Sequence, residues 1–206
     1  EMIDLMVESG CEYLNIAIES GTERVTRDII LKPLDFAHAK KMVAYMRKKG
    51  IYVSAGFIIG LPTETWDEVR KTIDFAEEIN VDYVKINTAI PLRNTELFDL
   101  AEKTNSIIQD TYDGESLWTV GGAITSDEWS ADDLTILRAY EWDRINFTDL
   151  KKLKKTADRM KISVKELNEI RRRTLDNARK TISSRQSAKE TKEPMTRATD
   201  VNLIKE

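Results

Sequence analysis

The sequence is poor in cysteine and has no long apolar run, and each shortage excludes a class of protein. Cys11 is the one cysteine among 206 residues, which excludes an internal disulfide framework and any zinc or iron-sulfur site built from several thiolates of this chain alone. No apolar run approaches the length of a membrane span, and no basic and then apolar leader opens the chain. With 41% apolar and 33% charged residues, the composition is that of a soluble globular protein, which we expect to be cytoplasmic and without a membrane partner.

The first residues predict that the chain is a piece of a longer protein. Residues 1–10, EMIDLMVESG, place Met2, Ile3, Met6 and Val7 at helical spacing, and a glycine follows. Since this pattern starts without an initiating methionine, we expect the chain to begin inside a helix of a larger protein.

Positive charge is concentrated near the C-terminal end. Residues 151–180 hold 12 Lys or Arg against 4 Asp or Glu, a local net charge of +8 in a chain whose total is −4. A solvated helix face explains this concentration more simply than an RNA-binding surface does. Nucleic acid is therefore an unfavoured partner, although the stretch IRRRT leaves it as an alternative. From residue 181 onward the chain is polar and free of aromatic residues, which predicts a disordered tail.

The first hundred residues alternate between helical and extended patterns. Strands are expected at residues 12–19, 51–60 and 82–90, and helices at residues 1–9, 22–49, 66–79 and 95–103. This alternation is typical of a parallel sheet with crossover helices. Farther along, SLWTVGGAIT indicates a short extended piece, whereas SADDLTILRAYEWDRINF and the basic stretch indicate helices.

Each expected strand has one apolar face and one small or polar face. The polar faces carry Asn15 and Glu19, then Ser54, Gly56 and Gly60, then Lys85 and Asn87. A doubly wound sheet would need apolar residues on both faces, whereas a (β/α) barrel with helices outside and a polar interior fits this division. We therefore predict an α/β fold, a partial (β/α) TIM-like barrel of about three parallel β/α units, followed by a helical C-terminal region.

The residues at the ends of these strands point to a ligand. Glu19, Gly60 and Asn87 lie at or near the carboxyl ends of strands, where ligands bind in such barrels. Glu19 is then a ligand group at the mouth of the barrel. The alternative is that its carboxylate stabilises the following helix through the helix dipole.

Two stretches of sequence resemble a known family. LNIAIESGTERV, followed by GIYVSAGFIIGLPTETWDEVRKTIDFAEEINVDYVKINTAIPLRNTELF, is similar to the second half of a radical S-adenosylmethionine (SAM) barrel, especially in the cobalamin-binding type and the methylthiotransferases. The resemblance covers residues 1–103 and, more loosely, residues 127–147. It implies three domain parts: the C-terminal half of the barrel at residues 1–104, a helical extension at residues 105–180, and the tail at residues 181–206.

The resemblance also implies a cofactor and its contacts. Radical SAM enzymes hold a 4Fe-4S cluster and SAM in the barrel, and reductive cleavage of SAM yields a 5′-deoxyadenosyl radical. Glu19 and Ser20 match positions that contact the ribose or amino acid part of SAM, and Lys32 matches a basic position that reaches its carboxylate. The segment from Gly56 through Ile58 to Gly60 matches the backbone that lies against adenine.

The last strand and its exit complete the implied set. Asn87 and Pro91 match residues near adenine or substrate. The resemblance assigns no catalytic and no metal-binding residue to this chain, and cobalamin is a further cofactor that it allows for the parent protein.

The sequence also departs from the family. Members commonly have Gly where Thr63 stands, and a Pro-Gly pair where Arg93 and Asn94 stand. The CxxxCxxC segment that binds the cluster is absent, so we expect its ligands outside this chain, in the missing N-terminal half of the barrel, and no radical chemistry from the chain alone.

Two other functions remain open. The chain can be a non-catalytic remnant or interaction module that docks on a partner, or a fragment of a barrel enzyme that binds phosphate at a helix amino terminus after Gly21 or Gly60. Trp118, Trp129 and Trp142 are expected to pack the C-terminal helices onto the barrel rather than to contact substrate.

Overall fold

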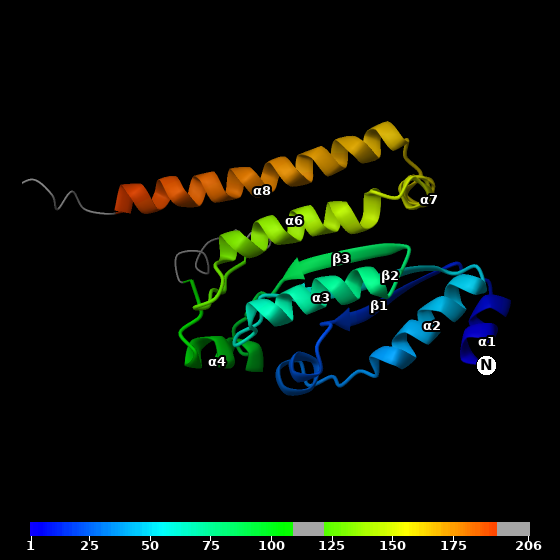
Figure 1. Ribbon diagram of the computed structural model, residues 1–206, viewed down its shortest axis with the longest axis horizontal. Helices are drawn as coiled ribbons and strands as arrows, with labels where there is room; N and C mark the ends of the chain where they lie inside the picture. The colour runs from blue at the N-terminus through cyan, green and yellow to red at the C-terminus, as the bar shows by residue number, and fades with distance from the viewer. Residues whose placement is uncertain (109–121, 193–206) are drawn as a thin grey trace, which may run out of the picture.

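The computed structural model describes residues 1–108 and 122–192, and Figure 1 shows their arrangement. Its three strands are β1 (Tyr13–Glu19), β2 (Tyr52–Ile59) and β3 (Tyr83–Thr88). They pair in parallel in the order β1-β2-β3, with helices between successive strands. The predicted fold class, three parallel β/α units of a partial barrel, is confirmed.

The helices of this part follow the apolar spacing of the sequence. They are α1 (Met2–Glu8), the π-helix η1 (Val25–Ile29), α2 (Phe36–Lys48), α3 (Trp66–Glu78) and α4 (Glu96–Lys103). The prediction of one helical region over residues 22–49 was wrong at its centre. Leu31 has a φ of +58° there, and Pro33 has no N–H to continue a helix, so η1 and α2 are separate.

One face of the sheet forms the main core. Val53, Ala55, Phe57 and Ile59 of β2 are fully buried in the same apolar cluster as side chains of α2 and α3. The Thr65 hydroxyl accepts from the N–H of Glu68, and the Glu68 carboxylate accepts from the N–H of Thr65, which fixes the start of α3. Helices α2 and α3 thus cover the apolar face of the sheet. The polar face is the opposite one, which would face the interior of a barrel.

The C-terminal region is helical. It consists of α6 (Ala131–Phe147), α7 (Leu150–Met160) and α8 (Val164–Lys192). In Figure 1, α6 lies beside β3, and α8 runs along α6 on the side away from the sheet.

Trp129 is buried, and Trp142 packs in the core and donates its indole N–H to the Tyr83 hydroxyl at 3.0 Å, so the packing role expected of both is confirmed. Trp118 and residues 116–121 of SLWTVGGAIT lie outside the described residues, whereas Ile124 forms an antiparallel bridge with Ile107.

The helix α8 continues beyond residue 181, where the sequence predicted the tail to begin. Thr181, Ser183 and Ser184 donate from their hydroxyls to carbonyls four residues earlier, which satisfies these polar side chains within the helix. The prediction is therefore wrong for residues 181–192, and residues 193–206 lie outside the described part of the chain.

The outer edge of β3 is covered by α6. The Asn146 side chain accepts from the N–H of Val84 at 2.8 Å and donates to the carbonyl of Val84 at 2.9 Å. Asn146 is 1% exposed, so these are buried bonds in place of a fourth strand. The amide of one side chain thus ends the sheet and fixes the C-terminal helices against it.

Candidate functional site

The strand β1 ends in an irregular geometry at Glu19. Its register with β2 shifts between Ala17, opposite Gly56, and Glu19, opposite Phe57, so Ile18 is the extra residue of a bulge. Glu19 itself has a φ of +70° and is half-buried. Positive φ is uncommon for a residue other than glycine, and bulges are frequent next to active sites, where they redirect a side chain. The bulge also interrupts the alternation of faces from which the orientation of Glu19 was predicted.

Ser20 and Gly21 are used inside the protein. The Ser20 side chain is fully buried and bonds to the Thr72 hydroxyl at 3.0 Å. The N–H of Gly21 donates to the same hydroxyl at 3.0 Å, and a Cβ on Gly21 would lie 2.7 Å from the carbonyl oxygen of Lys71. The structure therefore places Ser20 against α3, where it holds the backbone that follows Glu19.

Lys32 lies beside the end of β1. Its Nζ donates to the backbone carbonyl of Ala17 at 2.7 Å, and the residue is exposed. Ala17 is the last residue before the bulge and lies two positions before Glu19. The Lys32 ammonium group is therefore bonded to the backbone of β1 just before Glu19.

The polar face of β2 is open in its carboxyl half. Gly56 and Ile58 are half-buried, and a Cβ on Gly56 would meet only the carbonyl oxygen of Ile16, at 3.9 Å. Ile58 pairs in register with Asn87 of β3, which is exposed. An apolar side chain, a bare glycine backbone and an amide thus lie together on one surface.

Gly60 and Pro91 lie deeper than the sequence indicated. Gly60 is buried with a φ of +79°, and a Cβ there would lie 2.3 Å from Cδ1 of Leu134. The space on the Cβ side of Gly60 is therefore filled by a side chain of α6, and the expected contact of the Gly60 backbone with a ligand ring stays a prediction. Pro91 is buried three residues after β3.

Glu64 organises the loop after β2, and the sequence analysis missed it. Its Oε2 accepts from the N–H groups of Gly60 at 2.7 Å and Leu61 at 3.0 Å. The residue is 2% exposed and its Oε1 has no partner. Burial raises the pKa of this carboxyl to about 7, against the opposing effect of the two N–H groups. A glutamate four residues after a glycine, in GLPTE, was the available signal.

A second carboxylate holds the same loop from outside. The Arg24 guanidinium makes two bonds of 2.6 Å to Glu68 and one of 2.8 Å to the carbonyl of Thr63. This bond pair lowers the pKa of Glu68. The segment that follows β1 is thereby joined to the loop that follows β2.

Thr63 and Asn94, which stand where the family that the sequence resembles commonly has glycine, have a glycine-like backbone. Thr63 has a φ of +67° and Asn94 a φ of +66°. Asparagine tolerates this conformation better than threonine, whose branched Cβ makes it a strained residue there. Both positions thus have the positive φ that glycine adopts most readily.

The amino half of the polar face is a hydrogen-bonded network. The Asn15 Oδ1 accepts from the Ser54 hydroxyl at 2.7 Å and from Lys85 Nζ at 3.1 Å. Helix α7 covers this end, with the Arg159 guanidinium 5.1 Å from the Tyr13 ring centroid. A cavity of about 310 Å³ remains between α7 and the sheet. The polar face therefore has a covered amino end and an open carboxyl end.

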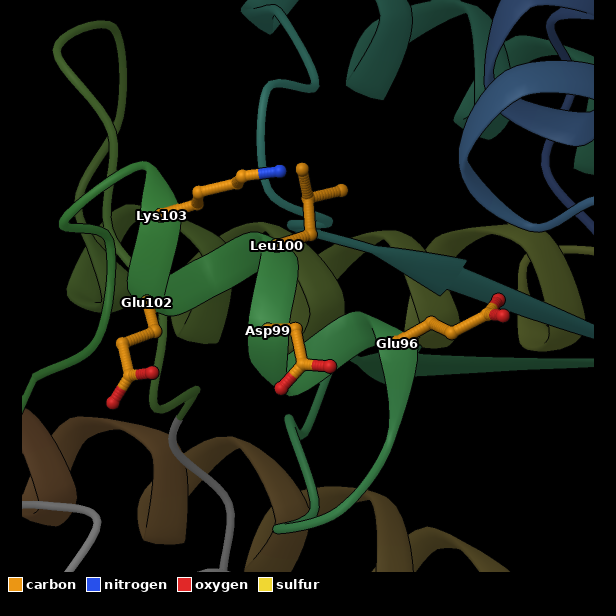
Figure 2. Close-up of a pocket in the computed structure, with 5 residues that line it drawn as sticks. All are labelled: Glu96, Asp99, Leu100, Glu102 and Lys103. Atoms are coloured by element: carbon orange, nitrogen blue, oxygen red, sulfur yellow. The ribbon is translucent and has the colours of Figure 1, made fainter.

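Another hollow lies on α4 and carries no comparable arrangement. Figure 2 shows Glu96, Asp99, Leu100, Glu102 and Lys103 lining it, with the three carboxylates pointing in different directions. Within residues 1–108 and 122–192, no group of three or more His, Cys, Asp or Glu is placed to hold a metal ion. None of the described helices is both long and apolar enough to cross a bilayer.

Comparisons with known proteins found one family model and several relatives that are similar to part of this chain. Residues 1–76 match the model of the radical SAM superfamily. Over 103 residues, 47% of this chain and 19% of the relative, the chain is 36% identical to cytidylyl-2-hydroxyethylphosphonate methyltransferase of Streptomyces wedmorensis. It is 33% identical over 103 residues to an uncharacterized methyltransferase of Pyrococcus horikoshii, across 50% of this chain and 22% of that protein.

Two further matches have lower identity. A putative methylthiotransferase of Methanocaldococcus jannaschii is 29% identical over 118 residues, 56% of this chain and 26% of that protein. The coproporphyrinogen III oxidase of Escherichia coli, a radical SAM enzyme, superposes with a TM-score of 0.48 at 17% identity, over 68% of this chain and 27% of that one. The chain thus spans about a fifth to a quarter of the length of these curated relatives.

Proposed function

We propose, on the premise that residues 1–76 belong to the radical SAM superfamily, that this chain is the SAM-binding half of a radical SAM enzyme. In this proposal residues 1–104 are the C-terminal half of the barrel and residues 105–180 an extension packed on it. The observation that carries the proposal is Glu19, held with a positive φ at a bulged strand end. Strain of this kind persists where the surrounding structure fixes it, and it is concentrated at ligand sites.

The described residues fit SAM. An ionised carboxylate accepts two hydroxyl donors, as a ribose presents, and Glu19 is the half-buried carboxylate at this strand end. The open space above Gly56, with Ile58 beside it, suits a flat adenine ring. Lys32 and Asn87 complete the proposed contacts, whereas Ser20 and Pro91 support the backbone from the buried side.

The residues do not fit the cluster that this family uses with SAM. A 4Fe-4S cluster is held by cysteine thiolates, and this chain has Cys11 alone. We therefore propose that the cluster ligands lie in another part of the protein. In this proposal the chain's own residues bind and orient SAM, and a cluster held elsewhere in the protein would supply the electron for SAM cleavage.

The relatives support a reaction class for this proposal, since two of them are named methyltransferases and one a putative methylthiotransferase. We propose transfer of a methyl or methylthio group to a substrate that the rest of the protein selects. No residue of this chain is assigned to cobalamin.

The phosphate alternative has less support, because the relevant N–H groups are occupied. The N–H of Trp66, first in α3, donates to Glu128 at 2.7 Å, and the N–H of Thr65 donates to Glu68 at 3.0 Å. The N–H of Gly21 donates to Thr72. A phosphate at either place would have to displace these partners.

The experiment that tests the proposal uses the longer protein. We expect its reading frame to encode a CxxxCxxC within about one domain's length before Glu1. Reconstituted with iron and sulfide and then reduced, that protein should give a 4Fe-4S electron paramagnetic resonance signal that changes when SAM is added. This chain alone, treated identically, should give none. A reading frame without the cysteines, or a signal indifferent to SAM, would contradict the proposal.

A further inference from the structure

The loop that follows β2 is held by residues from the C-terminal region. Trp129 is 3% exposed, and its indole Nε1 donates to the backbone carbonyl of Glu64 at 2.8 Å. Its neighbour Glu128 accepts from the N–H of Trp66 at 2.7 Å. The first bond joins two residues that are 65 positions apart in the sequence, and the second joins two that are 62 positions apart. Together they hold the end of the loop and the start of α3.

A third contact fixes the beginning of the loop. Leu134 is 1% exposed, and its Cδ1 lies 2.3 Å from the position a Cβ would take on Gly60. The Trp129 ring lies 3.6 Å from the same position. We call Glu128, Trp129 and Leu134 the Trp129 clamp. Since interiors are close-packed, Gly60 cannot move toward α6 without displacing Leu134.

A hydrogen-bonded turn at residues 126–129, just before α6, holds the clamp in place. The Ser126 hydroxyl accepts from the N–H groups of Glu128 at 3.1 Å and Trp129 at 3.2 Å, and the N–H of Ser126 donates to the carbonyl of Trp129 at 3.0 Å. The indole is therefore presented to Glu64 by a closed turn. The carboxylate of Glu64 in turn holds the N–H groups of Gly60 and Leu61.

We propose that the Trp129 clamp sets the backbone position of the Gly60–Glu64 loop and thereby the affinity for SAM. This inference rests on the proposed function, in which Gly56 and Ile58, just before this loop, lie against adenine. Trp129 is a positioning residue: it is buried and acts on the loop through the Glu64 carbonyl. The helical extension thus contributes to a site that is formed by the half-barrel.

Trp129→Phe in the longer protein tests the inference, with Trp142→Phe as the matched control. Both changes remove one indole N–H bond from the C-terminal region, but Trp142 donates to Tyr83, the first residue of β3, away from the loop. Calorimetric titration with SAM should show about two- to tenfold weaker binding for Trp129→Phe and unchanged binding for Trp142→Phe. Hydrogen exchange at the Gly60 and Leu61 amides should accelerate in Trp129→Phe alone.

The outcomes separate the two proposals. Absence of SAM binding by the unmodified protein would overturn the proposed function, and the inference about affinity with it. Normal binding by both variants, or an equal loss in both, would overturn the inference alone. If Trp129→Phe does not fold, Glu128→Ala against the exposed neighbour Asp127→Ala makes the same comparison, since only Glu128 accepts from Trp66.

Discussion

Single residues with unusual backbones or burial identify the carboxyl end of this sheet as the candidate site. Glu19 and Thr63 adopt positive φ, and Glu64 is a buried carboxyl with one unpartnered oxygen. Each of these features is costly by itself. Glu19 ends β1, and Thr63 and Glu64 lie in the loop that follows β2. Sequence reasoning found Glu19 from its place at the end of an apolar strand. It did not find Glu64, whose backbone carbonyl is bonded by Trp129, 65 positions away, and no local pattern connects the two residues.

Glu64 predicts a pH dependence of stability. Because its pKa in the folded protein is raised from 4.5 to about 7, the folded state binds the proton more tightly than the unfolded state does. The stabilisation is fully present below pH 4.5 and is lost as the pH rises through 7, a total of about 3 kcal/mol. Arg24 opposes this shift and Glu68 adds to it.

Denaturant unfolding of the chain and of Glu64→Gln, from pH 4.5 to pH 8, measures this effect. Glutamine keeps an acceptor oxygen for Gly60 and Leu61 and cannot ionise, so the decline should be absent from the variant. Parallel curves for the two proteins would show that Glu64 is not the titrating group.

Thr63 predicts a stabilising substitution. A branched residue at a φ of +67° is strained by about 1–2 kcal/mol, and glycine relieves this at some cost in chain entropy. Thr63→Gly should therefore raise the free energy of unfolding by about 1 kcal/mol. Thr65→Gly, the same change where φ is −81° and the hydroxyl caps α3, should lower it. The melting temperatures of both variants, compared with that of the unmodified chain, test this prediction. A lower melting temperature for Thr63→Gly would contradict the strain argument.

Among the elements, the strands were predicted well and the connections less well. The alternation of faces is local, so the polar face with Asn15, Ser54 and Lys85 followed from the sequence. The bulge at Ile18 did not, because it depends on the pairing of β1 with β2. The limits of α2 and α8 depend on single residues, such as Leu31, and on side-chain bonds to the helix backbone.

Asn146 predicts how strongly α6 is bound to the sheet. Asn146→Leu would leave the buried N–H and carbonyl of Val84 without partners, which should lower the free energy of unfolding by about 3 kcal/mol. Asn177→Leu, on an exposed position of α8, should change it by less than about 0.5 kcal/mol. Chemical denaturation compares the two, and an equal effect would mean that the amide does not terminate the sheet.

At the largest scale, the described part of the chain is a partial (β/α) barrel joined to helices that reach both ends of the sheet. Helix α7 covers the amino ends of the strands, where Lys155 contacts the buried Asp82 at 2.6 Å, and the Trp129 clamp holds the loop at the carboxyl ends. The open surface between them is the polar face near Glu19. The carboxyl end is therefore the accessible end of this face, and ligand binding there stays a prediction.

The most direct test of the central claim is a calorimetric titration with SAM, paired with a melting curve, of Glu19→Gln in the longer protein. Loss of a charge-assisted hydrogen bond to a ribose should cost on the order of 1.5 to 3 kcal/mol of affinity, about 10- to 150-fold, with little change in melting temperature. Glu23→Gln, an exposed carboxylate four residues later, is the control and should bind SAM normally. Unchanged affinity together with a clear fall in melting temperature would contradict the account and leave Glu19 as a carboxylate that stabilises the following helix.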